Sequence, residues 1–345
     1  MTEASPVSAK IAAFVARTAD RITELSSQLG QTVRVDRAGV LDRSAFADLQ
    51  PPGLISANGS CRLLRAADGW VVANLPRESD LDLAPAWIQR EIDGDPWAAI
   101  AGHLAALPWR EGVEGARLLG LPVAGVGEVS ADAPTTLHRR AAAGAPVRGR
   151  PIKVIDLSTM WAGPLCGQLL AEAGFEVVKY ESTSRPDGQR EGSPDFFARL
   201  NGRKAQATFD SASPADLAHL GDAMAAADLV LTSARPRAFA QMGLSPEALF
   251  ARNPRLTWVA VSGYGWTGDA ADRVAFGDDA AAAGGLVRWT AHGEPHFAGD
   301  ALADPLTGLA AAAGAFEALS LGGGFLVDAP MAGVASCVAA QAGLG

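Results

Sequence analysis

The stretch "IKVIDLSTMWAGPLCGQLLAEAGFEVVKYE", residues 152–181, decides the fold. It begins with a short apolar strand over 152–158, continues as a helix over 163–175, and returns to a strand over 176–181. Pro164 stands near the helix start and Gly174 near its end, where proline and glycine are each favoured. A strand, a helix and a second strand in this order predict two parallel strands joined by a crossover helix.

The same alternation continues downstream. Helices are predicted over 213–227 and 245–253, and strands over 228–233 and 256–263. The strands are almost continuously apolar, which is typical of a parallel sheet covered on both faces. We therefore predict an α/β fold with a doubly wound, Rossmann-like parallel sheet in a large domain over 151–345.

The preceding residues have a different pattern. An amphipathic helix is expected over 8–29, two strands around an Asp68-Gly69 turn over 61–76, and helices near 84–92, 96–105 and 111–119. These elements predict a small α+β domain over 1–128. Residues 129–150 are rich in Ala, Pro, Gly and Arg without periodicity, so a linker is expected there.

Composition limits the partners. The 345 residues carry a net charge of −9, which argues against a nucleic-acid partner because such proteins normally have a basic surface. Any anionic ligand must then be held by local positive charge or by helix N-termini. No apolar run approaches the ~20 residues of a membrane span, and the N-terminus has no secretory pattern.

Cysteines and histidines indicate where the protein works and what it does not bind. The three cysteines lack a CxxC spacing, which favours reduced thiols and a cytoplasmic protein. The five histidines form no HxH or HxxxH spacing, so no metal site is expected.

The carboxyl ends of the predicted strands are the expected ligand site, because parallel sheets bind ligands at that edge. Candidate anion-binding residues there are Arg185, Arg235, Arg237 and Arg273, with Trp161 beside them. No GxGxxG, P-loop or GxSxG motif accompanies them. The adjacent acids Asp278 and Asp279 would point in opposite directions on a strand, so they do not predict a catalytic pair.

Asp304, in "ALADPLTGLAAAAGAFEAL" (301–319), has two interpretations. Its local pattern favours a helix cap, because Asp is a common N-cap and Pro305 would occupy the first helical position. The alternative is that Asp304 does the chemistry.

Taken together, the segments between Lys153 and Gly333 resemble the class III CoA-transferase family, which contains formyl-CoA transferase and carnitine CoA-transferase. The segments that carry the resemblance are "KVIDLSTMWAGPLCGQLLAEAGFEVVKYES", "FFARLNGRKAQATFD", "ADLVLTSARPRAFAQMGLSPEALFARNPRLTWVAVSGYGWTG", "DRVAFGDDAAAAGG", "ADPLTGLAAAAGAFEAL" and "GGGFLVDAPMAG". The family's nucleophilic acid falls on Asp304, so the resemblance favours the catalytic interpretation.

The resemblance implies a CoA transferase that moves coenzyme A between an acyl-CoA and a free carboxylic acid through an aspartyl anhydride and an aspartyl thioester. It places the adenosine diphosphate near the strand ends, with phosphate contacts from arginines. The implied contact positions are Trp161, Ala162, Arg185, Phe209, Ser233, Ala234, Arg235, Arg237, Arg273 and Phe276. Backbone near Gly308, or the loop Asn58-Gly59-Ser60, would supply oxyanion donors.

The chain departs from the family pattern in its domain order and at several ligand-contact positions, namely Trp161, Ser233-Ala234, Arg237 and Gln241. "GSCRLLRAADGWVVANLPRESD" resembles part of the family's C-terminal portion, which predicts a permuted domain order. Phe276 stands where related acyl-CoA racemases have a histidine, which favours a transferase over a racemase. A racemase with an unrecognised second base and a non-catalytic CoA-binding protein remain the alternatives. The resemblance also implies an intertwined homodimer.

Overall fold

The computed structural model describes residues 6–142 and 144–340. Its main sheet has seven strands in the order β4-β12-β9-β8-β5-β6-β7, and all neighbours except β4 run parallel. The strands are β4 (Thr136–Arg139), β5 (Lys153–Leu157), β6 (Glu176–Ser182), β7 (Ala205–Phe209), β8 (Leu229–Thr232), β9 (Thr257–Ser262) and β12 (Phe325–Pro330). The predicted parallel α/β sheet is confirmed.

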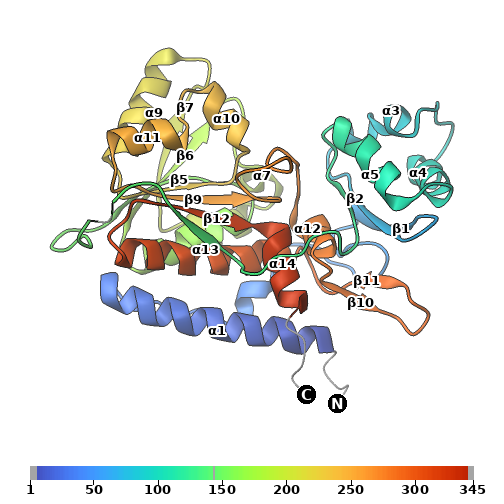
Figure 1. Ribbon diagram of the computed structural model, residues 1–345, viewed down its shortest axis with the longest axis horizontal. Coiled ribbons are helices and arrows are strands. Elements are labelled where there is room, and N and C mark those ends of the chain that lie inside the picture. Colours follow the sequence, from blue (N-terminus) through green and yellow to red (C-terminus); the bar gives the residue numbers. More distant parts are fainter. Residues whose placement is uncertain (1–5, 143, 341–345) are drawn as a thin grey trace.

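Helices cover both faces of this sheet because alternate side chains of each strand enter two different cores (Figure 1). In β8, Leu229 and Leu231 face one core and Val230 the other. The first core contains α6 (Ala162–Glu172), α8 (Pro194–Asn201), α13 (Ala303–Ser320) and α14 (Met331–Ala340). The second contains α9 (Pro214–Ala226), α10 (Pro236–Gln241) and α11 (Pro246–Arg252).

Strand β4 lies within residues 129–150, where an irregular linker was expected. It pairs antiparallel with β12 at the edge of the sheet, from Thr136 opposite Asp328 to Arg139 opposite Phe325. Its side chains are only partly buried or exposed, so it carries no apolar pattern by which the sequence would reveal a strand. Residues 136–139 of the expected linker thus form an edge strand of the main sheet.

A second, antiparallel sheet lies beside the first. It consists of β1 (Cys61–Arg65), β2 (Trp70–Asn74) and β3 (Val123–Gly125), and the predicted hairpin is confirmed. Helices α2 (Glu78–Leu81), α3 (Ala84–Ile88), α4 (Pro96–Ala105) and α5 (Trp109–Leu118) accompany it, and α3, α4 and α5 share a core with one of its faces. The other face packs on α12 (Gly277–Ala283). The hairpin of β10 (Val287–Trp289) and β11 (Pro295–Phe297) follows α12.

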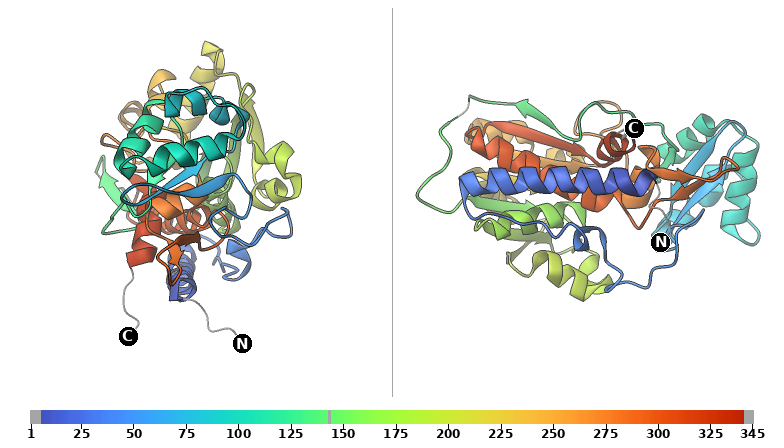
Figure 2. Two further views of the ribbon diagram at one scale, coloured as in Figure 1. Left: turned by 90° about the vertical axis from the view of Figure 1, so that its right-hand side faces the viewer. Right: turned by 90° about the horizontal axis from the view of Figure 1, so that it is seen from below.

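The N-terminal helix α1 (Pro6–Leu29) packs against α13 and not against the small sheet (Figure 2, right). Its apolar residues Ile11, Phe14, Ile22 and Leu25 are buried in the same core as the main sheet. The predicted small domain over 1–128 thus contains one helix, α1, that packs in the core of the main sheet. A short 3₁₀ helix, η1 (Gly39–Leu41), follows α1, and α7 (Gln189–Gly192) precedes α8.

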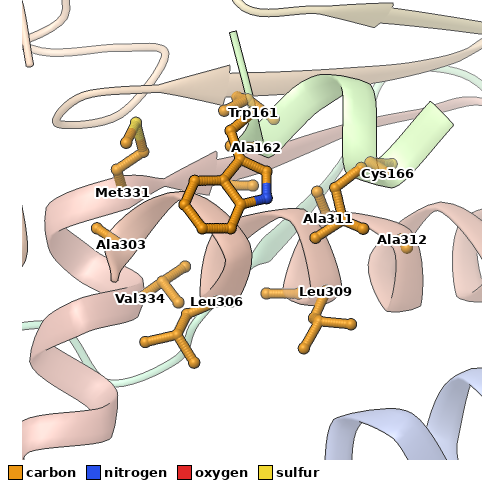
Figure 3. Close-up of a cluster of buried hydrophobic side chains, with 14 of the residues drawn as sticks. Trp161, Ala162, Cys166, Ala303, Leu306, Leu309, Ala311, Ala312, Met331 and Val334 are labelled. Atoms are coloured by element: carbon orange, nitrogen blue, oxygen red, sulfur yellow. The ribbon is translucent and has the colours of Figure 1, made fainter. Parts of the chain in front are cut away.

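Helices α6 and α13 approach each other closely because small residues line their contact. A Cβ built on Gly308 would lie 2.7 Å from the carbonyl oxygen of Ala162 and 2.9 Å from Leu165 Cδ2. Figure 3 shows Trp161 and Ala162 against the apolar side chains of α13. This contact fixes the start of α6 against the first turns of α13.

We predict that Gly308→Ala lowers the free energy of unfolding by about 1–3 kcal/mol, because its methyl group would press on a backbone carbonyl. Gly102, exposed on α4 with no atom near its Cβ position, is the matched control. Gly102→Ala should raise stability by about 0.5–1 kcal/mol through helix propensity. Urea unfolding of both variants measures this, and a Gly308→Ala protein as stable as wild type would contradict the packing argument.

Candidate active site

The Asp304 carboxylate lies where the first turns of three helices meet. Asp304 is the second residue of α13, and its carboxylate accepts hydrogen bonds from the backbone N–H groups of Ala162 and Gly277. Ala162 is the first residue of α6, and Gly277 is the first residue of α12. A Cβ on Gly277 would lie 2.3 Å from Asp304 Oδ2, so only glycine lets the α12 backbone come this close.

Asp304 is not the cap of its own helix. The helix begins at Ala303, Leu302 is the N-cap residue, and no side chain caps this end. The neighbours Ala303, Pro305 and Leu306 are buried, whereas Asp304 is partly exposed. The capping interpretation is therefore wrong, and the carboxylate is held instead by the first residues of two other helices.

Burial raises the pKa of Asp304 to about 7, and the Asp300 charge acts in the same direction. The Arg43 guanidinium and the N–H groups of Ala162 and Gly277 oppose this rise. Both protonation states of Asp304 are consequently populated near neutral pH, which suits a group that acts as a nucleophile or exchanges a proton.

Three further charged residues surround Asp304. The Arg43 guanidinium binds the Asp300 carboxylate through Nε at 2.5 Å and Nη2 at 2.9 Å. The Asp278 carboxylate accepts from the backbone N–H of Ala301 at 2.8 Å and from Asn58 Nδ2 at 3.4 Å. Burial raises the pKa of Asp278 to about 7, and the charges of Asp300 and Asp304 add to this effect.

Sequence reasoning did not select Arg43, Asp300 or Asp278 for the site. Asp278 was set aside because adjacent acids on a strand diverge, but it lies in the first turn of α12. Arg43 is 257 residues from Asp300 and belongs to no motif, so no local pattern could have pointed to it. The four-residue separation of Asp300 and Asp304 was the one available signal.

Two residues that precede the helices of the site, Met160 before α6 and Ala301 before α13, adopt a rare backbone conformation. Met160 and Ala301 have φ values of 72° and 43°, in the left-handed region that non-glycine residues seldom occupy. Met160 N–H donates to Asp187 Oδ1 at 3.1 Å, and Ala301 N–H donates to Asp278. Such strain clusters at functional sites, where surrounding contacts hold it in place.

Two buried ion pairs hold the loop between β5 and α6. Lys179 Nζ binds Asp187 at 3.1 Å and the Ser158 carbonyl oxygen at 2.6 Å. Lys204 Nζ binds Asp156 at 2.7 Å and the Pro164 carbonyl oxygen at 2.9 Å. Both pairs are inaccessible to solvent, and they fix the loop that presents the Ala162 N–H to Asp304.

The predicted CoA-contact residues fall into two groups. Trp161 and Ala162 lie at the Asp304 site, Phe276 precedes Gly277, and Ser233 Oγ accepts from the Thr159 N–H at 2.9 Å. Arg235 is partly buried and Arg237 and Ala234 are exposed at the end of β8. Burial lowers the pKa of Arg235, and the charges of Arg237, Arg185 and Arg77 act in the same direction. Four guanidinium groups therefore share one region.

Arg273 and Phe209 stand apart from this region. Arg273 binds Glu128 at 2.5 Å and the Val123 carbonyl oxygen at 3.2 Å, and its guanidinium stacks on Tyr264 at 3.7 Å. It thus joins the small sheet to the loop before α12, where its charge is already paired. Phe209 is buried in the second core of the main sheet.

The two predicted oxyanion donors have different surroundings. Gly308 lies inside α13, where helical geometry directs its N–H to the carbonyl of residue 304, so that prediction is wrong. The loop of Asn58 to Ser60 does lie beside the site, because Asn58 Nδ2 contacts Asp278.

Among the described residues, no three His, Cys, Asp or Glu side chains are placed to hold a metal ion. Within 6–142 and 144–340, every helix is too short or too polar to cross a membrane.

Residues 150–343 match the model of CoA-transferase family III. The chain is 35% identical over 177 residues to succinyl-CoA–D-citramalate CoA-transferase of Chloroflexus aurantiacus, covering 49% of this chain and 44% of that protein. It is 30% identical over 209 residues to succinate–glutarate CoA-transferase of Agrobacterium fabrum, covering 55% and 52%. A solved CAIB/BAIF family protein from Brucella suis superposes with a TM-score of 0.51 at 28% identity, covering 55% of each chain. The chain spans about half the length of the curated relatives it matches.

Asp279, next to Asp278, makes the free energy of unfolding depend on pH. Burial raises its pKa to about 8, against hydrogen bonds from Asn74 Nδ2 at 2.8 Å and the Phe276 N–H at 2.9 Å, both to Oδ1. The folded state therefore binds a proton that the unfolded state has lost, between about pH 4 and pH 8. Stability contributed by this group is present below pH 4 and is lost as pH rises to about 8.

We predict that Asp279→Asn weakens this pH dependence, because asparagine keeps the Oδ1 acceptor and removes the titration. Between pH 5 and pH 7 its free energy of unfolding should fall less than that of wild type, by up to about 1.4 kcal/mol per pH unit. Asp222→Asn on α9 is the control, since the Asp222 side chain is 74% exposed. Equal slopes for wild type and Asp279→Asn in denaturant titrations would refute the assignment.

Proposed function

The chain belongs to CoA-transferase family III, and from this membership we propose that it transfers coenzyme A from an acyl-CoA thioester to a free carboxylic acid, with Asp304 as nucleophile. The observation that carries the proposal is the Asp304 carboxylate held by the N–H groups of Ala162 and Gly277, in a residue that is partly exposed among buried neighbours. A carboxylate is the nucleophile that this exchange requires, because it forms and releases both anhydrides and thioesters.

The proposed reaction balances without net proton transfer. An Asp304 oxygen attacks the thioester carbonyl carbon, the C–S bond breaks, and CoA thiolate leaves an acyl-aspartyl anhydride. The thiolate attacks the aspartyl carbonyl carbon and releases the donor carboxylate, which leaves an aspartyl-CoA thioester. The acceptor carboxylate attacks this thioester, and the returning thiolate takes the new acyl group and frees Asp304.

The backbone donors have a defined part in this cycle. Each attack on the aspartyl carbonyl carbon puts negative charge on an Asp304 oxygen, and fixed N–H donors stabilise such charge. The N–H groups of Ala162 and Gly277 already point to this carboxylate. They replace the predicted donor near Gly308. Asn58, beside Asp278, is available to the carbonyl oxygen of the bound acyl group.

The region of Arg77, Arg185, Arg235 and Arg237 suits the phosphates of CoA. The positive charges of these arginines are close enough to affect the pKa of Arg235. In a chain whose net charge is −9, such a concentration of positive charge is a local feature. Arg77 connects this region to the start of α12, because its guanidinium carbon is 5.9 Å from the Phe276 ring and Gly277 follows Phe276. Its guanidinium also binds Asp80 at 2.7 Å. A CoA molecule with its phosphates at the arginines would extend past Phe276 toward Asp304.

A second activity, exchange of the α-hydrogen of an acyl-CoA, is favoured by one observation. Asp278 lies beside Asp304, and the charge of each acts on the other. The pair supplies the second acid or base that Phe276 cannot provide. Asp278 is only 2% exposed, which makes it less accessible to substrate than Asp304 and places transfer first.

The permuted domain order and the two-fold dimer remain proposals. Residues 1–149 precede the stretch that matches the family model and supply Arg43, Asn58 and Arg77 to the surroundings of Asp304. This is the contribution expected of a displaced small domain. The proposed dimer would add residues of a second chain to the same site.

We predict that Asp304→Asn lowers transfer by a factor of at least about 1,000, because an amide cannot form the anhydride. After incubation with acyl-radiolabelled acyl-CoA, hydroxylamine should convert Asp304 of the wild type to a hydroxamate detectable by peptide mass spectrometry. Asp222→Asn, on exposed α9, should react like the wild type. Turnover of Asp304→Asn at wild-type rate would overturn the assignment, and α-deuterium uptake without transfer would support the second activity.

We predict that Arg235→Gln and Arg185→Gln weaken CoA binding about 10- to 100-fold, the cost of one charge-assisted hydrogen bond each. Turnover at saturating substrate should change less, because these arginines lie away from the reacting atoms. Isothermal titration with CoA and dephospho-CoA measures the loss and shows which phosphate is involved. Arg252→Gln, an exposed arginine of α11, is the control. Unchanged affinity in both variants would remove the arginine region from the site.

A further inference from the structure

The segment over residues 36–46 contacts the main domain at several points. Arg199 of α8 donates to the carbonyl oxygens of Asp42 at 3.0 Å and Gly39 at 2.6 Å. Ser193 Oγ donates to the Phe46 carbonyl oxygen at 3.0 Å. These contacts carry Arg43 to the Asp304 site, although the segment lies outside the stretch that matches the family model.

The Arg43 side chain is fixed from two directions. Its two bonds to Asp300 use the planar fork of the guanidinium, a geometry that lysine cannot reproduce. The guanidinium carbon also lies 5.3 Å from the centre of the Trp161 ring, next to Ala162. Only 14% of the Arg43 side chain and 10% of the Asp300 side chain are exposed, so the pair is largely shielded from solvent.

We propose that Arg43 is a positioning residue for Asp304: bound to Asp300 and packed on Trp161, its guanidinium holds a positive charge near the Asp304 carboxylate and favours the ionised form. The inference rests on the proposed function of Asp304. It assigns to residues outside the family-matched stretch a part in the chemistry as well as in ligand binding.

The charges that face Asp304 come from several elements. Arg43 contributes the positive charge from the 36–46 segment, Asp300 a negative charge from the loop before α13, and the N–H groups of Ala162 and Gly277 partial positive charge from α6 and α12. Asp278, on α12, interacts with Asp304 as a like charge. The charges of Asp300, Asp304 and Asp278 all act on Arg43 and raise the pKa of its guanidinium.

This arrangement gives two variants of opposite sign. Arg43→Met removes the cation, so the pKa of Asp304 should rise above about 7, by about one unit or more. Asp300→Asn removes a like charge and releases the guanidinium, so the pKa of Asp304 should fall. A purely structural role of the pair would produce the same loss of stability in both variants and no opposite movement of the pKa.

The experiment is a pH titration of the full-length protein labelled with ¹³C at the aspartate carboxyl carbon. The Asp304 resonance is assigned by its absence in Asp304→Asn, and the titration midpoint is compared in wild type, Arg43→Met, Arg43→Lys and Asp300→Asn. Arg37→Met is the matched control, since Arg37 lies in the same segment and pairs with exposed Asp20. We expect the midpoint to rise in Arg43→Met, to rise less in Arg43→Lys, to fall in Asp300→Asn and to stay in Arg37→Met.

The pH dependence of transfer activity should shift in the same direction as the titration midpoint in each variant. The carboxylate is the reacting form, so the acidic limb of the rate profile should move to higher pH in Arg43→Met, and raising the pH should recover part of the loss. A midpoint unchanged in both Arg43→Met and Asp300→Asn overturns the inference, even where Asp304→Asn is inactive. A chain without transfer activity would refute the proposed function, while the titration would still decide the part of Arg43. If Arg43→Met does not fold, the fall in Asp300→Asn alone decides.

Discussion

The close packing of α6 on α13 is the constraint on which the site depends. Gly308 lets the two helices approach until its Cα faces the Ala162 carbonyl oxygen. The same approach brings the Ala162 N–H to Asp304, one turn earlier on α13. Gly277 likewise lets α12 approach Asp304, because any side chain there would occupy the position of the Asp304 carboxylate. Two glycines thus set the distance between the Asp304 carboxylate and its backbone donors.

The loop that begins α6 is held by groups that are costly to bury. An ion pair removed from water loses hydration that its attraction only partly repays, so Lys179–Asp187 and Lys204–Asp156 are poor sources of stability. Both pairs bond the backbone around the loop, where Met160 has a positive φ. Their contribution is to fix one loop conformation, and breaking either pair would leave a buried charge.

The sequence was sufficient for strands β5, β6, β8 and β9 of the sheet and insufficient for most of the site. Alternation of apolar strands and helices predicts β5, α6 and β6 because burial on two faces imposes it. β4 has no such pattern, because an edge strand with exposed side chains needs none. Local pattern assigned Asp304 to a cap, and only the resemblance pointed to chemistry. Arg43 and Asp278 reach Asp304 through contacts between distant segments, which no spacing encodes.

The residues around Asp304 come both from the stretch that matches the family model and from the residues before it, and this has a consequence for how the proposed activity could vary. Asp304 and its backbone donors lie within 150–343, whereas Arg43, Asn58 and Arg77 lie before it. In the proposed reaction, the residue that forms the bonds, Asp304, therefore lies in one part of the chain. The side chains whose charges affect it lie in another part. If Asp304 is the nucleophile as proposed, substitutions in the first part of the chain would change its acidity and the choice of ligand without changing Asp304 itself.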